Sequence, residues 1–145
     1  MNKDEMAVQK MAEGYNCAQS VLFACGDDLG IDVQALVKVA SGFGAGMGRK
    51  GEVCGALTGG IIALGDRYGR GQGDDRSATE ATYSKTAELM DRFEAAHGTI
   101  LCRELLGGCD LSTAEGRQVF AEKELGRNVC QHCVRTVVLS LEELL

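Results

Sequence analysis

The C-terminal segment of the chain carries the pattern that most limits its fold. Its apolar residues recur at steps of three and one, in the order Cys130, Cys133, Val134, Val137, Val138, Leu141 and Leu144. Such steps place side chains on one face of an α-helix, whereas a half-buried strand alternates at every second residue. Alternating β-branched runs are absent from the 145 residues, and spacings of three and four recur throughout. We therefore predict an all-α fold.

Capping residues divide the chain into a predicted bundle of about six to eight helices. Asn, Asp, Ser and Thr at helix starts accept hydrogen bonds from the first free backbone N–H groups. The expected helices cover about 4–13, 17–28, a stretch after Asp32, 53–68, 76–96, 99–106, 112–124 and 128–145, with caps at Asn16, Asp32, Thr99, Ser112 or Thr113, and Asn128. A glycine-rich loop fills 42–51. No repeat, linker or second domain is evident, so residues 1–145 are expected to form one domain.

Composition excludes several classes of protein. The net charge of −6 argues against a nucleic-acid partner, which usually requires a basic surface. The N-terminus lacks the basic and then apolar order of a signal peptide, and the longest apolar stretch, 56–64, is too short to span a bilayer. We expect a cytoplasmic protein without a membrane partner. Seven cysteines in such a chain indicate metal ligands or redox groups rather than structural disulfides.

The stretch SGFGAGMGRKGEVCGALTGG, residues 41–60, contains eight glycines around Cys54. Residues 46–51 match the dinucleotide-binding pattern of glycines, but that mechanism requires a preceding strand, and the preceding segment is helical by period. Gly55, Gly59 and Gly60 fall inside a predicted helix, where each costs about 1 kcal/mol relative to alanine. These glycines predict a smooth helix face that another backbone, or a bulky cofactor, approaches closely beside Cys54.

Four cysteines fall at the predicted starts of four helices: Cys17, Cys54, Cys102 and Cys130. A helix N-terminus stabilises a thiolate and lowers its pKa. Arg49 and Lys50 are expected to lower the pKa of Cys54 further, in a loop that leaves the helix start hydrated. The alternative is that these thiols only fill the core, since free cysteine is among the most buried residue types. The spacing Cys130-x-x-Cys133 suits a redox dithiol or half a zinc knuckle, but no second such pair exists.

The chain resembles the C_GCAxxG_C_C family of redox-active proteins in four blocks: GYNCAQSVL, SGFGAGMGRKGEVCGALTGGIIALGDRYG, CRELLG followed by DLSTAEGR, and VCQHCVR. The resemblance implies that the family's cysteines are Cys17, Cys54, Cys102 and Cys130. It also implies that Cys133, Cys25 and Cys109 lie outside the family's cysteine pattern. Part of the family is similar to split-Soret cytochromes, but this chain has no Cys-x-x-Cys-His, so haem is not expected.

Two functions remain open from the sequence. The first is a thiol redox protein, with possible thiol–disulfide oxidoreductase activity, in which Cys54 attacks and the electrons pass to a redox partner or small thiol. The second is a metal-binding protein whose four thiolates hold zinc or an iron–sulfur cluster. A helical interaction protein or small-molecule sensor is a third class, and a homodimer stays open. Both leading functions require the four cysteines to lie close together.

Overall fold

The computed structural model describes residues 1–145, and its regular structure is helical. No sheet forms; one isolated antiparallel bridge joins Val53 and Leu101. The all-α prediction is therefore confirmed. Eight right-handed α-helices occur: α1 (Lys3–Ala12), α2 (Cys17–Ala24), α3 (Val33–Val39), α5 (Gly55–Tyr68), α6 (Ser77–His97), α7 (Cys102–Leu105), α8 (Ala114–Glu122) and α9 (Gln131–Leu144). Between them lie α4 (Gly44–Met47), the 3-10 turns Gly26–Asp28 and Ala40–Phe43, and a π-helical turn, Gly126–Cys130.

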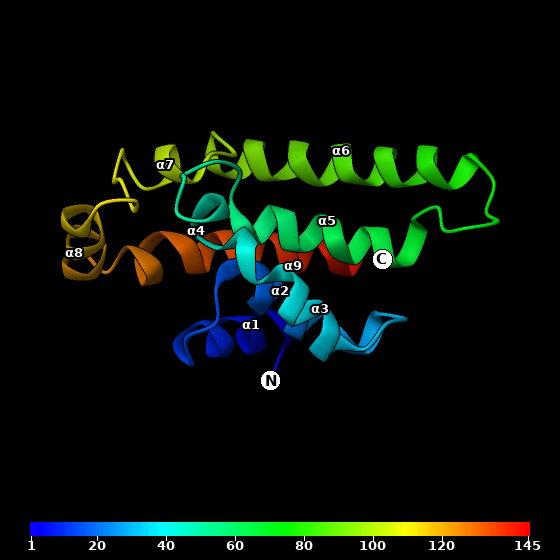
Figure 1. The fold of residues 1–145 in the computed structure, drawn as a ribbon, viewed down its shortest axis with the longest axis horizontal. Helices are drawn as coiled ribbons and strands as arrows, with labels where there is room; N and C mark the ends of the chain where they lie inside the picture. The colour runs from blue at the N-terminus through cyan, green and yellow to red at the C-terminus, as the bar shows by residue number, and fades with distance from the viewer.

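The helices form an elongated bundle around α5 and α9. Figure 1 shows α6 along one long edge, α5 and α9 through the middle, and α1, α2 and α3 on the opposite side. The short elements α4, α7 and α8 gather at one end of the molecule (left in Figure 1). The helices α5 and α9 thus run through the middle of the bundle, and the short, irregular segments lie together at one end.

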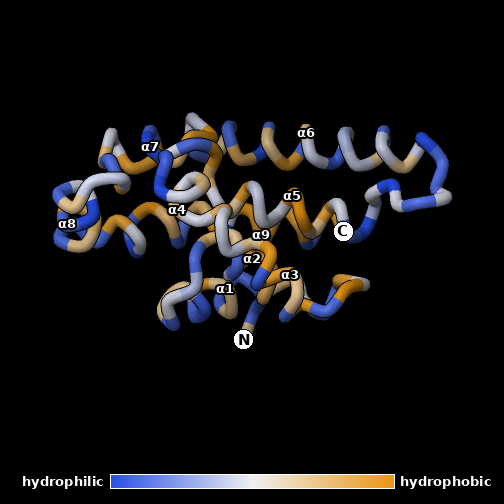
Figure 2. The backbone as a smooth tube through the Cα atoms, in the orientation of Figure 1, coloured by the Kyte–Doolittle hydropathy of each residue, from blue (hydrophilic) through white to orange (hydrophobic).

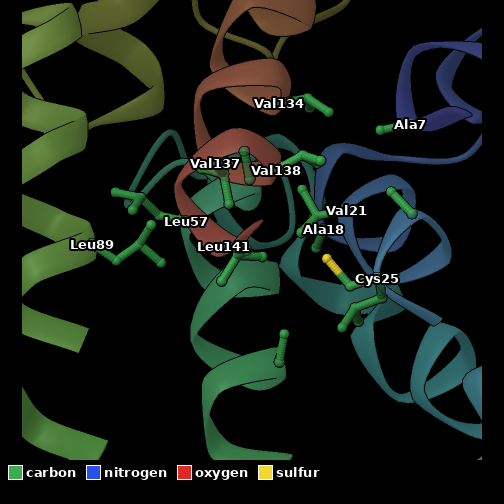
Figure 3. Close-up of a cluster of buried hydrophobic side chains, with 14 of the residues drawn as sticks. Ala7, Ala18, Val21, Cys25, Leu57, Leu89, Val134, Val137, Val138 and Leu141 are labelled. Atoms are coloured by element: carbon green, nitrogen blue, oxygen red, sulfur yellow. The ribbon is translucent and has the colours of Figure 1, made fainter. Parts of the chain in front are cut away.

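The core consists of side chains from five helices. Figure 3 shows Leu57 of α5, Leu89 of α6 and Val137 of α9 meeting in the middle, with Val21 of α2 and Ala7 of α1 to one side. All five side chains have an exposed fraction of 0%. Burying each leucine or valine stabilises the fold by roughly 1.5–3 kcal/mol. The apolar face predicted for the last helix is confirmed, because Cys133, Val134, Val137, Val138, Leu141 and Leu144 are all buried.

Apolar and polar residues alternate along each helix. Figure 2 shows short hydrophobic and hydrophilic stretches following one another along α5 and α6. No helix combines the length and the apolar character that crossing a membrane requires. The hydrophobic residues instead face neighbouring helices, as in other amphipathic bundles.

The glycines of α5 let α2 approach it closely. A Cβ added to Gly59 would lie 2.7 Å from the carbonyl oxygen of Ala18, and one added to Gly55 would lie 3.0 Å from that of Phe43. Both distances are shorter than ordinary van der Waals contacts. The predicted close approach of another backbone to these glycines is confirmed: it is that of α2 and of the turn before α4.

Two predicted helix caps are wrong. Asn16, Asp32 and Thr113 accept cap hydrogen bonds as expected. Thr99, however, accepts a bond from the N–H of Leu101, so α7 begins only at Cys102 and spans four residues. Asn128 lies inside the π-helical turn that leads directly into α9, and its side-chain amide donates to the carbonyl of Lys123.

Candidate functional site

Five cysteines line one cavity of about 400 Å³: Cys17, Cys54, Cys102, Cys130 and Cys133. The four cysteines expected to lie together therefore do so, and Cys133 joins them. All seven thiols of the chain are free in this structure. Cys25 lies elsewhere, among the side chains of the core (Figure 3). Cys109 also lies outside the cavity, and its thiol donates to the carbonyl of Gly116.

Cys17 is positioned by the residues around the start of α2. Asn16 caps the helix in a capping box: its side-chain oxygen accepts from the N–H of Gln19, and its own N–H donates to the side-chain oxygen of Gln19. The amide of Asn16 also donates to the carbonyl of Ser41, at 3.0 Å. A Cβ on Gly44 would fall 2.5 Å from that amide nitrogen, so Gly44 leaves the space that the cap occupies. Cys17 is thereby held as the first residue of α2.

Cys54 and Cys102 are brought together by the isolated bridge between their segments. The N–H of Cys54 donates to the carbonyl of Ile100 at 2.8 Å, and the N–H of Cys102 donates to that of Glu52 at 2.7 Å. The bridge joins the starts of α5 and α7, because Cys54 is the cap of α5 and Cys102 is the first residue of α7. Cys54 and Cys102, which are 48 residues apart in sequence, thus lie beside each other in the lining of the cavity.

Cys130 and Cys133 line the cavity from the segment where the π-helical turn becomes α9. They are three residues apart, so they share one side of the helix. Cys130 ends the π-helical turn and has right-handed helical backbone angles, φ −62° and ψ −39°. It does not lie at a helix N-terminus, and this part of the sequence prediction is wrong. A π-helical turn adds a residue to one helical turn and recurs at functional sites of proteins.

Cys54 and Cys133 interact through their thiols. The hydrogen bond from the Cys133 thiol is the largest cause of a lowered pKa at Cys54; burial opposes it, and the backbone N–H groups of Ala56 and Leu57 lower the pKa further. The same bond, with burial, raises the pKa of Cys133 far above its ordinary value. Cys133 is therefore the proton donor of the pair, and Cys54 is the sulfur that takes the negative charge.

Cys17 and Cys130 form a second pair. The hydrogen bond between them is the main reason that the pKa of Cys17 is raised and that of Cys130 is lowered. Cys102 has no such partner, and burial raises its pKa to about 12. The cavity thus contains two thiols with a lowered pKa, each beside a thiol with a raised pKa, and a fifth thiol that stays neutral at neutral pH.

The rim of the cavity includes a left-handed turn. Residues 45–49 all have positive φ, among them the non-glycine residues Ala45, Met47 and Arg49 at 55°, 67° and 67°. Each such residue costs about 1–2 kcal/mol relative to a right-handed conformation. At Gly46 a Cβ would fall 2.6 Å from the backbone nitrogen of Glu52, so only glycine fits. Strain of this kind persists only where surrounding structure enforces it, and it clusters at functional sites.

The electrostatic prediction for Cys54 needs two corrections. Its pKa is lowered, as expected, and the backbone N–H groups at the start of α5 contribute as predicted, but Cys133 is the largest cause and Arg49 and Lys50 are not among the causes. The expected hydrated surroundings are also wrong, because only 5% of Cys54 is exposed. In the sequence, only the Cys130-x-x-Cys133 spacing indicated a role for Cys133. That spacing alone is a weak signal, because no second pair accompanies it.

The arrangement of the donors bears on whether the cavity can hold a metal ion. No group of three or more His, Cys, Asp or Glu side chains is arranged to hold a metal ion. The sulfurs instead pair as Cys54 with Cys133 and Cys17 with Cys130. This arrangement does not fit the four-thiolate zinc or iron–sulfur site that was the alternative from the sequence.

Comparisons with known proteins identify the family of the chain. A protein from Archaeoglobus fulgidus, named only as uncharacterized, is 29% identical over 123 residues, which are 80% of this chain and 82% of the relative. No solved structure matches. The model of the family described as "Putative redox-active protein (C_GCAxxG_C_C)" matches residues 15–144, which include all the cysteines. The chain therefore belongs to the C_GCAxxG_C_C family, as the resemblance in sequence implied.

Proposed function

We propose that the protein exchanges electrons through thiol–disulfide chemistry, with Cys54 as the attacking sulfur and Cys133 as its resolving partner. The observation that carries the proposal is that both thiols line one cavity and interact there, which lowers the pKa of one and raises that of the other. A nucleophilic thiolate beside a second thiol is the arrangement that disulfide exchange requires. The name of the family supports redox activity in general.

The reaction proceeds in two exchange steps. The Cys54 thiolate attacks one sulfur of a disulfide substrate, so a mixed disulfide forms and the other half of the substrate leaves as a thiolate. That thiolate takes the proton of Cys133. The Cys133 thiolate then attacks Cys54, which forms an intrachain disulfide and releases the second half of the substrate. Two electrons pass from the protein to the substrate, and the reverse steps reduce the protein.

Cys17 and Cys130 are proposed as a second dithiol of the same kind. Their hydrogen bond produces the same contrast between one sulfur with a raised pKa and one with a lowered pKa. Both pairs line the same cavity. An electron pair therefore has a route from one dithiol to the other by exchange within the chain. Cys102, whose pKa is about 12, is assigned the role of a neutral thiol in the wall.

Mild oxidation followed by peptide mapping tests the proposal. Reduced protein is treated with oxidised glutathione, free thiols are alkylated, and disulfide-linked peptides are identified by mass spectrometry. We expect a reversible bond between Cys54 and Cys133, lost in Cys54→Ser and retained in Cys25→Ser, since Cys25 lies in the core away from the cavity. Thiols that stay unpaired, together with stoichiometric zinc or iron in the purified protein, would overturn the proposal in favour of metal binding.

A further inference from the structure

The cavity has a charge that contrasts with the rest of the protein. The chain as a whole has a net charge of −6, with 21 acidic and 15 basic residues. The residues that line the cavity nevertheless include Arg49 and Arg117 and no aspartate or glutamate. In a predominantly acidic chain, a cavity lined by two arginines and no carboxylate is selective for an anion.

Both arginines are exposed and available to a ligand. Neither Arg49 nor Arg117 takes part in any of the six ion pairs of the structure. Arg117 is oriented by a 3.0 Å hydrogen bond from its guanidinium to the carbonyl of Leu111. Arg49 ends the left-handed turn, four residues after Ala45, and both residues line the cavity. The left-handed turn therefore places the positively charged side chain of Arg49 at the edge of the cavity.

Apart from the thiols, the two arginines, Tyr15 and Asn16, the cavity is lined by apolar groups. Its aliphatic, thioether and phenyl side chains come from α1, α7, α8 and the adjoining turns: Met11, Leu105, Leu106, Leu111, Phe120 and Val129. The volume of about 400 Å³ lies within the range of small-molecule sites, roughly 300–1,000 Å³. The cavity thus combines an apolar interior, a cationic edge and a wall of sulfurs.

We propose that the substrate is a small disulfide with an apolar body and a carboxylate or similar anion. The body occupies the apolar interior, the anion pairs with Arg49 and Arg117, and the disulfide reaches Cys54. The inference rests on the proposed function and specifies its substrate. Its chemistry is the same exchange: the substrate disulfide is reduced to two thiols, and the dithiol of Cys54 and Cys133 is oxidised to a disulfide. A protein substrate is disfavoured, because 95% of Cys54 is withdrawn from the surface and the space beside it suits a small molecule.

Binding of a redox-inert probe tests the ligand class separately from the reaction. Octanoate has an apolar chain and a carboxylate but no disulfide, and octylammonium has the same chain with a positive charge. Calorimetry should detect octanoate and not octylammonium. Replacing both cations, in the double variant Arg49→Gln with Arg117→Gln, should weaken octanoate binding about tenfold, as expected for the loss of charge-assisted hydrogen bonds.

The control variant is Arg67→Gln, which removes an exposed arginine of α5 outside the cavity. It should leave octanoate binding unchanged. Because both tested arginines are exposed, the double variant should retain the wild-type melting temperature, which is measured alongside. Octanoate that fails to bind, or that binds the double variant as well as wild type, would overturn the inferred substrate class. The redox proposal would survive that result if Cys54 and Cys133 still formed a reversible disulfide.

A second measurement compares two disulfide reagents. Dithiobis(nitrobenzoate) is aromatic and anionic, whereas dithiodipyridine is aromatic and neutral. The ratio of their rates with the reduced protein should fall about tenfold in the arginine double variant and stay constant in Arg67→Gln. A ratio that stays constant in both variants would show that the arginines do not select the substrate. Slow reaction with both reagents in wild type would instead argue against the proposed function itself.

Discussion

The thiol of Cys133 on α9 interacts with the sulfur of Cys54 at the start of α5, and this interaction is the largest cause of the lowered pKa of Cys54. The two residues are 79 positions apart in sequence, and their meeting depends on the packing of α9 against α5. The bundle therefore determines the reactivity of Cys54, because it delivers the proton donor that stabilises the thiolate.

Removing this donor should raise the pKa of Cys54. In Cys133→Ala the thiolate loses its hydrogen bond while burial, which disfavours charge, remains. In Cys133→Ser a hydroxyl donor remains, so the pKa should shift less than in Cys133→Ala. The measurement is the ultraviolet absorbance of the thiolate as pH rises, with the signal of Cys54→Ser subtracted from that of each protein. The order of midpoints, wild type lowest and Cys133→Ala highest, is the expected result.

The same experiment can contradict the assignment. If Arg49 and Lys50 controlled the pKa of Cys54, the midpoint would rise when these cations were replaced by glutamine and would not respond to Cys133→Ala. We expect the opposite pattern, because a thiol and two backbone N–H groups lower this pKa against the opposing effect of burial.

Alkaline pH should destabilise the fold through Cys25. Burial is the main cause that raises the pKa of this thiol from 9.0 to about 12. Between these values the unfolded thiol has lost its proton and the native one has kept it, so the unfolded state binds fewer protons. The free energy of unfolding should then fall as pH rises, by about 1.4 kcal/mol per pH unit for this group.

Urea unfolding of wild type and Cys25→Ala from pH 8.5 to 11 measures this contribution. The variant should be less stable at every pH, because it leaves a small cavity beside Ala18 and Val21 (Figure 3). Its free energy of unfolding should nevertheless fall less steeply with pH than that of wild type. Cys102, with a pKa of about 12, adds its own decline in both proteins and does not affect the comparison. If the free energy of unfolding fell with the same slope in both proteins, Cys25 would ionise equally in the native and unfolded states.

Much of this structure follows from local signals in the sequence. The period of the apolar residues identified α9, and side-chain caps identified the starts of α2 and α3. These features depend on residues within a few positions of one another, so a pattern of spacing contains them. The gathering of Cys17, Cys54, Cys102 and Cys130 followed from the resemblance to a family, and helix starts supported it for the first three.

Other features depend on contacts between distant segments. Cys102 is placed by the bridge between residues 53 and 101, not by the cap predicted at Thr99. Cys130 belongs to a π-helical turn, which has no reliable sequence pattern. The glycine-rich loop contained a left-handed turn in which Arg49 is itself strained, although spacing suggested only a flexible loop. In each case tertiary contacts override local preference.

Gly59 should be intolerant of a side chain, whereas Gly65 in the same helix should accept one. A methyl group at Gly59 would collide with the backbone of Ala18, and nothing lies within 4 Å of the position it would take at Gly65. Gly59→Ala should lower the free energy of unfolding by roughly 1–3 kcal/mol. Gly65→Ala should raise it by up to about 1 kcal/mol, since alanine is the better helix former.

Thiol reactivity of the two glycine variants adds a second readout. Because α2 begins with Cys17, displacing α2 from α5 should also separate Cys17 from Cys130. Reversible pairing of these two thiols should therefore decline in Gly59→Ala and persist in Gly65→Ala. A Gly59→Ala protein with wild-type stability and thiol pairing would show that the close approach of α2 is dispensable.

The left-handed turn predicts a reversal of the usual preference between alanine and glycine. Met47 has φ of 67°, where a Cβ is strained and glycine is not. Met47→Gly should therefore be more stable than Met47→Ala by about 1 kcal/mol, since the two variants lose the same side-chain contacts and differ only in the Cβ. At the exposed Ala81 of right-handed α6, Ala81→Gly should instead lower stability by about 1 kcal/mol. Chemical denaturation of the four proteins measures both differences. If glycine were the less stable residue at both positions, the backbone at Met47 would be right-handed in solution, and the edge that carries Arg49 to the cavity would not be formed as described.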